Sequence, residues 1–240
     1  MHNITNINFE DRYIAFRKKE NRVYTDEEVL KLPSISSSHT HYQEWLLREE
    51  SSKRLKKYLT AKRKPLTILE IGCGNGWLSN LLSGIPNSKV TGIDINRTEL
   101  LQAERVFKNT PNLRFEYGEI NETLYGQRFD IILFAASIQY FRTFSNTINL
   151  VMQMLNKNGE IHIIDSHFYS EDKLNEAQIR SKEYYKSLGF PEMADHYFHH
   201  SIEALKIFDA KFLYKRSTFK RLLGIKNPFP WICIKPVRIS

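Results

Sequence analysis

Three glycines alternate with other residues directly after a short apolar run. The run is Leu66–Ile71, and the glycines are Gly72, Gly74 and Gly76. Glycine has no Cβ, so the backbone turns sharply there and a ligand can approach it closely. The G-x-G-x-G spacing is one residue shorter than the G-x-G-x-x-G fingerprint of dinucleotide-binding loops. The loop therefore predicts a nucleoside ligand other than a dinucleotide.

A carboxylate follows at the end of the next apolar run. Asp94 closes the strand-like run Lys89–Ile95, 18 residues after Gly76. A carboxylate in this place accepts hydrogen bonds from the two hydroxyls of a ribose. Open α/β sheets bind their ligands at the carboxyl ends of parallel strands, so the glycines and Asp94 should share one site.

The elements that must position these residues alternate between strands and helices. This alternation predicts an α/β fold, Rossmann-like and doubly wound, with a mostly parallel sheet and helices on both faces. A polar arm with short helices precedes it over residues 1–40, and one of these helices starts near Thr25, a capping residue followed by acids. Strands are expected at 66–71, 89–95, 113–117, 130–134, 160–165, 211–214 and 231–235, and helices at 41–60, 77–82, 99–109, 147–155 and 171–188, with a turn at 156–159.

The chain is expected to form one catalytic unit with a cover. Residues 1–64 are predicted to be an amino-terminal arm with helical lid segments, and 65–240 the catalytic domain with a lid insertion at about 168–205. Aromatic residues are frequent in the insertion, and with Tyr42 and Trp45 they could wall off a cavity. We expect a monomer or a homodimer.

Composition limits the compartment and the metal chemistry. No apolar run approaches the ~20 residues that span a bilayer, and the amino terminus lacks the core of a signal peptide, so a cytoplasmic protein is expected. Cys73 and Cys233 are the two cysteines, and their separation gives no zinc-binding spacing. We predict reduced thiols and no metal.

The net charge of +8 is concentrated in two stretches. Residues 53–64 hold seven basic residues and no acid, and residues 206–221 hold six basic residues and one acid. Such stretches are most often solvated surface. The alternative is a patch for an anionic substrate, a membrane surface or RNA, and the sequence leaves both open.

The order of these elements resembles that of class I S-adenosylmethionine-dependent methyltransferases, in particular small-molecule members of the type 11/12 kind. Residues 68–76 resemble their motif I in the form E-x-G-C-G-x-G. Residues 90–95, 115–120 and 129–134 match their next three motifs in order, and 155–160 matches their last turn loosely. The resemblance covers residues 42–170 and implies a seven-stranded sheet with an antiparallel last strand.

The resemblance also implies roles for single residues around S-adenosylmethionine as the cofactor. Asp94 would hold the ribose, Ile95 would pack on the adenine, and Glu119 would lie beside the adenine amino group, where the family more often has Asp. Ala135 would lie against the methionine portion, and Glu70 near its amino end. The full predicted cofactor set is Glu70, Gly72, Cys73, Gly74, Gly76, Asp94, Ile95, Glu119, Ile120 and Ala135.

The acceptor side is expected at the ends of the fourth and fifth strands. Residues 134–141 lack the prolines that base-methylating nucleic-acid enzymes of the superfamily often carry there, so a nucleic-acid acceptor is not expected. Tyr140 and His167 are the predicted catalytic residues, because both follow these strands and histidine exchanges protons near neutral pH. His196, His199 and His200 could contribute to the substrate cleft, bind a metal or form one aromatic helix face.

We therefore predict a methyltransferase that acts on a small-molecule acceptor at oxygen, nitrogen or carbon. One alternative is an RNA or protein methyltransferase that uses the basic stretches. The other is a non-catalytic module that binds the cofactor.

Overall fold

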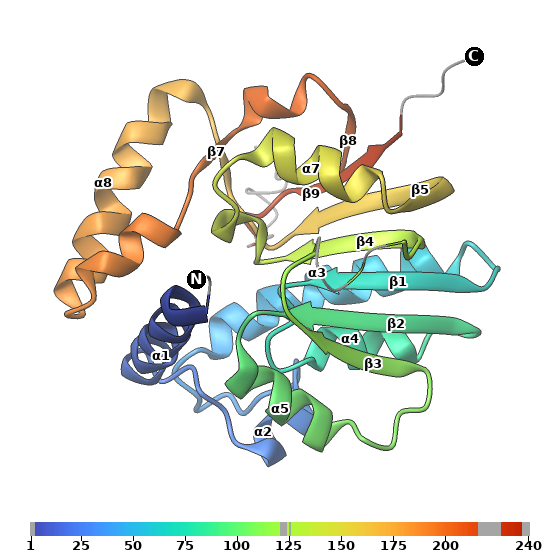
Figure 1. Cartoon of the computed structure of the whole chain (residues 1–240), viewed down its shortest axis with the longest axis horizontal. Helices are drawn as coiled ribbons and strands as arrows, with labels where there is room; N and C mark the ends of the chain where they lie inside the picture. Colours follow the sequence, from blue (N-terminus) through green and yellow to red (C-terminus); the bar gives the residue numbers. More distant parts are fainter. Residues whose placement is uncertain (1–2, 121–123, 125, 216–226, 237–240) are drawn as a thin grey trace.

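A seven-stranded sheet forms the centre of the molecule in a computed structural model that describes residues 3–120, 124, 126–215 and 227–236 (Figure 1). The strand order is β3-β2-β1-β4-β5-β9-β8. β9 runs antiparallel to β5 and to β8, and the other neighbours in the sheet are parallel. The predicted doubly wound sheet with an antiparallel last strand is confirmed. The strands are β1 Leu66–Ile71, β2 Ser88–Asp94, β3 Leu113–Tyr117, β4 Phe129–Ala135, β5 Leu155–Ile164, β8 Asp209–Tyr214 and β9 Trp231–Lys235.

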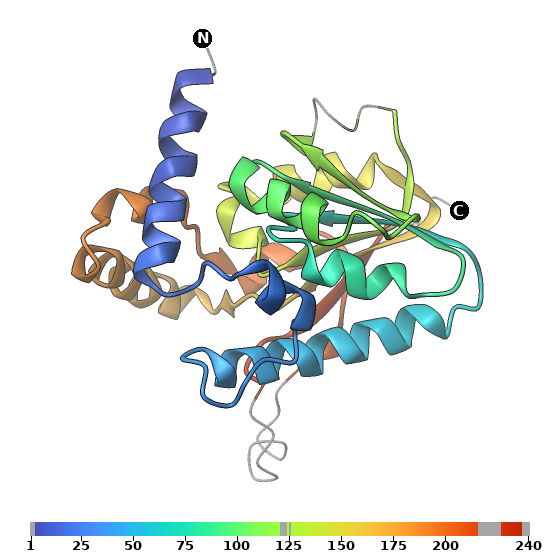
Figure 2. The ribbon, with the colours of Figure 1, turned by 90° about the horizontal axis from the view of Figure 1, so that it is seen from below.

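Helices cover both faces of this sheet. α3 and α4 pack on one face, where Leu55, Leu59 and Leu82 join one buried cluster, and α3 runs along the sheet in Figure 2. α7 packs on the other face through Phe144, Ile148 and other apolar residues of a second cluster. The α-helices are α1 Asn3–Lys19, α2 Asp26–Lys31, α3 Tyr42–Thr60, α4 Trp77–Ser83, α5 Arg97–Val106, α7 Phe144–Met152 and α8 Glu171–Ser187.

The two central strands are apolar along nearly their whole length because both of their faces are covered. β1 and β4 each bury five or more of their side chains, and Ile68, Leu69 and Leu133 are fully inaccessible. Strands of this kind carry continuous apolar runs instead of an alternation. The sequence therefore located them within a residue of their observed ends.

Two expectations about local structure were wrong. The arm before residue 40 contains a 17-residue helix, α1, and not only short helices. The fifth strand begins at Leu155, because residues 156–159 bulge out within β5 while it pairs with β4, so they are not a turn that precedes the strand. The short helix at Thr25 is confirmed, with a complete capping box between Thr25 and Glu28.

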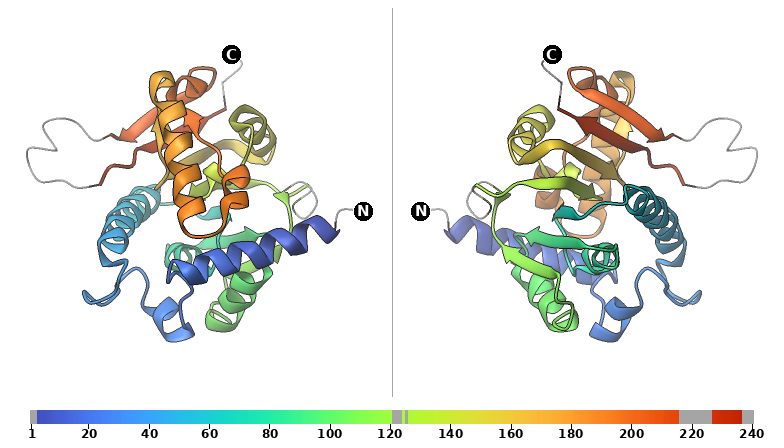
Figure 3. Two further views of the ribbon diagram at one scale, coloured as in Figure 1. Left: turned by 90° about the vertical axis from the view of Figure 1, so that its left-hand side faces the viewer. Right: turned by 90° about the vertical axis from the view of Figure 1, so that its right-hand side faces the viewer.

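α1 and α8 lie in front of the strand ends and cover the carboxyl edge of the sheet (Figure 3). Phe16 of α1 packs on Tyr185 of α8 with ring centroids 5.0 Å apart, and Arg12 lies 3.5 Å from Glu192. Two short 3-10 helices, η2 Pro191–His196 and η3 Ile202–Leu205, and a two-stranded sheet of β6 Phe168–Tyr169 and β7 His200–Ser201 complete this region. The division at residue 64 and the lid insertion remain predictions, and α3 shares its core with the sheet.

None of the helices in the described ranges combines the length and the apolar character that a bilayer crossing needs.

A buried carboxylate holds the opposite, amino-terminal edge together. Glu160 of β5 is 3% exposed and accepts hydrogen bonds from the hydroxyl of Tyr58 on α3. Lys62 Nζ lies 2.7 Å from it, and Lys235 Nζ of β9 lies 2.9 Å from it. Nε2 of His162 lies 3.2 Å from Oε2 of Glu160. One carboxylate thus connects α3, β5 and β9.

Substitution Glu160→Gln should reduce the free energy of unfolding by about 3 kcal/mol at pH 7, because it removes the buried charged partner of two lysines and of the imidazole of His162. Burial opposes ionisation, but His162, Lys62 and Lys235 hold the pKa of the Glu160 carboxyl well below its usual range. A carboxyl with a lowered pKa stabilises the fold above its unfolded-state pKa of about 4.3, and this contribution is lost as the pH falls towards the folded-state value. Urea unfolding at pH 7 and at pH 3 should therefore show a smaller difference between wild type and variant at the lower pH.

Glu176→Gln is the control, since this exposed acid also pairs with two cations, Lys173 and Arg180. It should leave stability unchanged. Equal losses for both variants would contradict the role given to Glu160.

Candidate functional site

A cavity of about 460 Å³ opens at the carboxyl ends of β1, β2 and β4, under α1. Seven of the twelve predicted site residues line it, and five do not. Those that do are Gly72, Gly74, Asp94, Ile95, Glu119, Ile120 and Tyr140, and those that do not are Glu70, Cys73, Gly76, Ala135 and His167.

Asp94 lies between the glycine loop and the start of α5. The backbone N–H of Gly74 donates to its Oδ2 at 2.7 Å, and that of Asn96 donates to its Oδ1 at 2.8 Å. Burial raises the pKa of the Asp94 carboxyl, while these backbone donors oppose the shift. Each carboxylate oxygen has a further lone pair, so the side chain can also accept from ligand hydroxyls in the cavity.

The glycine loop tolerates no side chain at two of its positions. A Cβ on Gly72 would stand 2.6 Å from the Cβ of Ser137, and one on Gly76 would stand 2.5 Å from the ring of Phe115. Both glycines also have φ values above +70°, which residues with a Cβ adopt at a cost. Gly72 lines the floor of the cavity, and Gly76 lies behind that floor.

Glu70 and Cys73 support the loop from the side away from the cavity. Glu70 accepts a hydrogen bond of 2.5 Å from Ser79 Oγ of α4, and burial raises its pKa to about 8. Cys73 lies against Gly92 of β2, where an added Cβ would meet its sulfur at 2.8 Å. Burial raises the pKa of the Cys73 thiol, so it remains protonated and is a filler of the turn.

Tyr140 enters the cavity from the 3-10 helix η1 Ile138–Tyr140, which follows β4. Burial raises the pKa of its phenol, so at neutral pH it donates a hydrogen bond and does not act as a base. Ala136, with φ of +53°, takes the place in the lining that was predicted for its neighbour Ala135.

His167 lies outside the cavity. Its ring packs on Phe229 at 4.6 Å and on Tyr169 at 5.8 Å, and burial lowers its pKa. Its predicted catalytic role therefore has no support from the cavity lining.

α1 supplies cavity residues that were not predicted. Phe9, Glu10 and Tyr13 line the wall opposite the glycine loop. Phe9, Tyr13 and Phe16 follow one another at spacings of four and three, a helical stripe that could have indicated a buried face. The predicted wall residues Tyr42 and Trp45 do not line the cavity, and Trp45 packs on Trp77 behind the loop with centroids 5.3 Å apart.

Glu99 of α5 is a further unpredicted carboxylate in the lining, and it faces Gly74. Burial raises its pKa to about 7, Arg17 of α1 lowers it, and Asp94 raises it. Arg17 also lies 3.6 Å from Glu20. Arg17 of α1 therefore interacts with the acids Glu99 and Glu20 and with the rings of Tyr13 and Tyr140.

The three clustered histidines do not share one helix face, which corrects one of the three interpretations of that segment. His196 ends η2 and lines the cavity, whereas His199 bonds to Ser181 Oγ and His200 to the carbonyl of Ile138. They also do not form a group of possible metal ligands within the described part of the chain.

One group within the described residues could hold a metal, and it consists of Glu160, His162 and Cys233 at the amino-terminal edge of the sheet, opposite the cavity. His162 Nδ1 accepts from Trp231 Nε1 at 3.1 Å, so Nε2 carries the proton that faces Glu160. A neutral imidazole in this tautomer has no lone pair left for a metal. The lysines beside Glu160 supply the positive charge instead.

The family comparison agrees with the motifs. A family model described as a methyltransferase domain matches residues 62–220. A malonyl-[acyl-carrier protein] O-methyltransferase of Acetivibrio thermocellus is 34% identical over 95 residues, which are 39% of this chain and 33% of the relative. One from Halalkalibacterium halodurans is 25% identical over 147 residues, 57% of this chain and 54% of the relative. The matches thus span a third to a half of these relatives.

Solved structures share the fold. Magnesium protoporphyrin IX methyltransferase from Synechocystis PCC 6803, with bound SAH, has a TM-score of 0.59 at 13% identity and covers 91% of this chain and 97% of that one. The plantazolicin methyltransferase BpumL, in complex with a monoazolic desmethylPZN analog and SAH, has a TM-score of 0.57 at 17% identity, and the match covers 98% of both chains. At these identities the likeness concerns the fold alone.

Gly72→Ala should destabilise the protein more than Gly126→Ala. Both positions have positive φ, so both variants incur the left-handed penalty of about 1–2 kcal/mol. Among the described residues, only the new Cβ at position 72 collides with a neighbour, which adds about 1–3 kcal/mol of overpacking, whereas none of their atoms lies within 4 Å of a Cβ at Gly126. Chemical denaturation of the two variants measures the difference, and equal losses would contradict the close approach to Ser137.

Proposed function

Because the chain belongs to the methyltransferase domain family, we propose that it is an S-adenosylmethionine-dependent methyltransferase that acts on a small molecule. The observation that carries the proposal is the joint between loop and strand, in which Gly74 donates to Asp94 at the edge of the cavity. This joint supports the proposal, because Asp94 would accept from a ribose beside a backbone that a ligand can approach.

The lining supports a division of labour around the cofactor. Asp94 would accept from the ribose hydroxyls, while Ile95 and Ile120 would pack on the adenine and Glu119 would lie beside its amino group. Gly72 and Ala136 would lie under the methionine portion. The sulfonium of the cofactor is already activated for displacement, so the protein's contribution would be proximity and alignment of the acceptor.

Closure by α1 supports the same proposal. Its residues Phe9 and Tyr13 cover the cavity, and Glu10 accepts from the backbone N–H of Thr98 at 3.0 Å. A covered cavity excludes water from the reacting atoms. Phe9, Tyr13 and the strand ends would therefore enclose the cofactor and the acceptor together.

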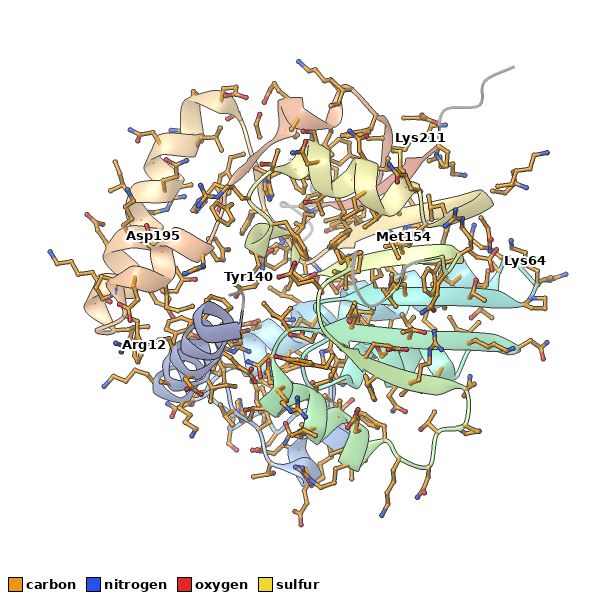
Figure 4. All side chains as sticks on the ribbon, in the orientation of Figure 1. Arg12, Lys64, Tyr140, Met154, Asp195 and Lys211 are labelled. Atoms are coloured by element: carbon orange, nitrogen blue, oxygen red, sulfur yellow. The ribbon has the colours of Figure 1, made fainter. Side chains whose placement is uncertain are left out.

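The RNA or protein alternative has less support from the arrangement of charge. The basic stretch 53–64 ends at Lys64, beside the amino terminus of β1, and Figure 4 shows Lys64 at the right-hand edge of the molecule, away from Tyr140 near its centre. Basic residues there would not guide an acceptor into the cavity. The second stretch is described only to residue 215, and the rest of it lies outside the described residues.

A measurement of turnover distinguishes the non-catalytic alternative from the proposal. Binding of S-adenosylmethionine without any release of S-adenosylhomocysteine across acceptors would favour it. A cytoplasmic location and a monomeric or homodimeric state stay predictions from the sequence.

Asp94→Asn should weaken S-adenosylmethionine binding by about ten- to a hundredfold, because a charge-assisted pair of hydrogen bonds to the ribose is reduced to one neutral acceptor. Isothermal titration measures the affinity. No binding by the wild type would rule out the proposal.

Asp130→Asn is a matched control. Asp130 also accepts from a backbone N–H, that of Thr67 at 2.9 Å, but it lies at the amino end of β4, outside the cavity. Its substitution should leave the affinity within twofold of wild type.

A further inference from the structure

The wall of the cavity has two chemically different parts. One consists of the glycine loop, Asp94 and the residues beside them, which the proposed cofactor would occupy. The other is a set of rings contributed by α1, η1 and η2 and by the residue after η1. We call this set the aromatic wall: Phe9, Tyr13, Tyr140, Phe141 and His196. Rings of this kind favour flat apolar ligands.

The charges around the cavity are unfavourable for an anion. The described lining residues include four acids and neither lysine nor arginine, the acids being Glu10, Asp94, Glu99 and Glu119. The nearby cation Arg17 lies 3.6 Å from Glu20 and interacts with Glu99, so its charge is already balanced. Asp94, Glu99 and Glu119 lie on the side of the proposed cofactor, whereas Glu10 of α1 adjoins Phe9 of the aromatic wall. A carboxylate or phosphate on the acceptor would face this acid, with no lysine or arginine among the described lining residues to pair with.

His196 is the imidazole of the aromatic wall. Its ring packs on Phe9 with centroids 4.6 Å apart, at the exposed mouth of the cavity. No hydrogen bond or ion pair connects it to another described residue, whereas its neighbours His199 and His200 are both hydrogen-bonded. Its ring nitrogens are therefore available to a ligand, and histidine exchanges protons near neutral pH.

We propose that the aromatic wall binds an uncharged aromatic acceptor with a hydroxyl or amino nucleophile, and that His196 takes the proton of that nucleophile. The inference rests on the proposed methyl transfer. The acceptor is small, because one cavity of about 460 Å³ holds it together with the cofactor, and typical ligand cavities of roughly 300–1,000 Å³ hold a single drug-sized molecule.

The reaction then balances without a further reagent. An acceptor hydroxyl gives its proton to His196, and the freed electron pair on oxygen forms a bond to the methyl carbon. An amino nitrogen forms that bond with its lone pair, and the resulting ammonium then gives its proton to His196. The bond from that carbon to the sulfonium breaks, and its electron pair stays on sulfur as neutral S-adenosylhomocysteine. The imidazolium releases the proton to water at the mouth of the cavity. Tyr140, which keeps its proton, would orient the acceptor by a hydrogen bond.

This acceptor differs in charge from the one for which the relatives described above are named, a malonyl group on an acyl carrier protein. A malonyl group attached through one carboxyl offers its other carboxylate as the oxygen nucleophile, and that group is an anion at neutral pH. The acidic residues of the cavity lining therefore disfavour an anionic acceptor of this kind in this chain.

Matched pairs of probes test the charge argument. 4-Hydroxybenzamide and 4-aminobenzamide are compared with 4-hydroxybenzoate and 4-aminobenzoate, and malonyl-CoA is the fifth probe. With S-adenosylhomocysteine bound, each amide should bind at least tenfold more tightly than its carboxylate at pH 7, since like charges a few ångströms apart repel. With S-adenosylmethionine, malonyl-CoA should give no product. The proposal is overturned by equal or tighter binding of the carboxylates, by binding of neither amide, or by methylation of malonyl-CoA.

Two histidine variants test the proton transfer on whichever amide is methylated. His196→Gln should lower kcat at least a hundredfold, because the base is gone. His199→Gln, three residues away and outside the cavity, should leave kcat unchanged. An unchanged kcat in His196→Gln overturns the role of His196.

Titration with S-adenosylmethionine separates this inference from the function beneath it. If the cofactor does not bind, methyl transfer itself is refuted. If it binds and the probes give the contrary results, only the acceptor assignment falls.

Discussion

The site depends on the hydrogen bond from the Gly74 backbone to the Asp94 carboxylate. It joins the loop after β1 to the end of β2, and the backbone N–H groups of Gly72 and Cys73 add bonds to the carbonyl of Ile93. The same carboxylate accepts from Asn96, which caps α5. One side chain therefore fixes the loop, the start of the next helix and the floor of the cavity. A carboxylate held by two backbone donors is also oriented in advance, so it loses little freedom when a ligand binds.

The cover over that floor comes from distant parts of the chain. α1 precedes the sheet in sequence, and η2 follows its fifth strand, yet Phe9 and His196 meet at the cavity mouth. Phe16, Tyr185 and Met193 form a small core between them. This core is separate from the two that flank the sheet, so the cover could vary in sequence without disturbing the cavity floor.

The difference between floor and cover explains how much could be predicted from the sequence. The floor is local, since a buried strand, a glycine loop and a strand-ending Asp94 each leave a pattern within a few residues. The cover joins segments that lie far apart in the sequence, and no pattern near Phe9 or His196 predicts that their rings are in contact. His167 shows the same limit, because it was predicted as a site residue and does not line the cavity. It follows a strand end, as a site residue should, but Asp165 with φ of +54° turns the chain first, and the ring packs on Phe229. Proximity in sequence to a strand end does not fix where a side chain points.

The two edges of the sheet also differ in how completely their polar groups are paired. At the amino-terminal edge Glu160 has four donors, and that edge contributes stability. At the carboxyl-terminal edge, Asn96 Nδ2 is buried without a hydrogen-bond partner among the described residues, and Ala136 has a left-handed backbone. An unpaired donor and a strained backbone cost free energy and persist mainly where function requires them. Both residues line the cavity, so this cost falls where a ligand would bind.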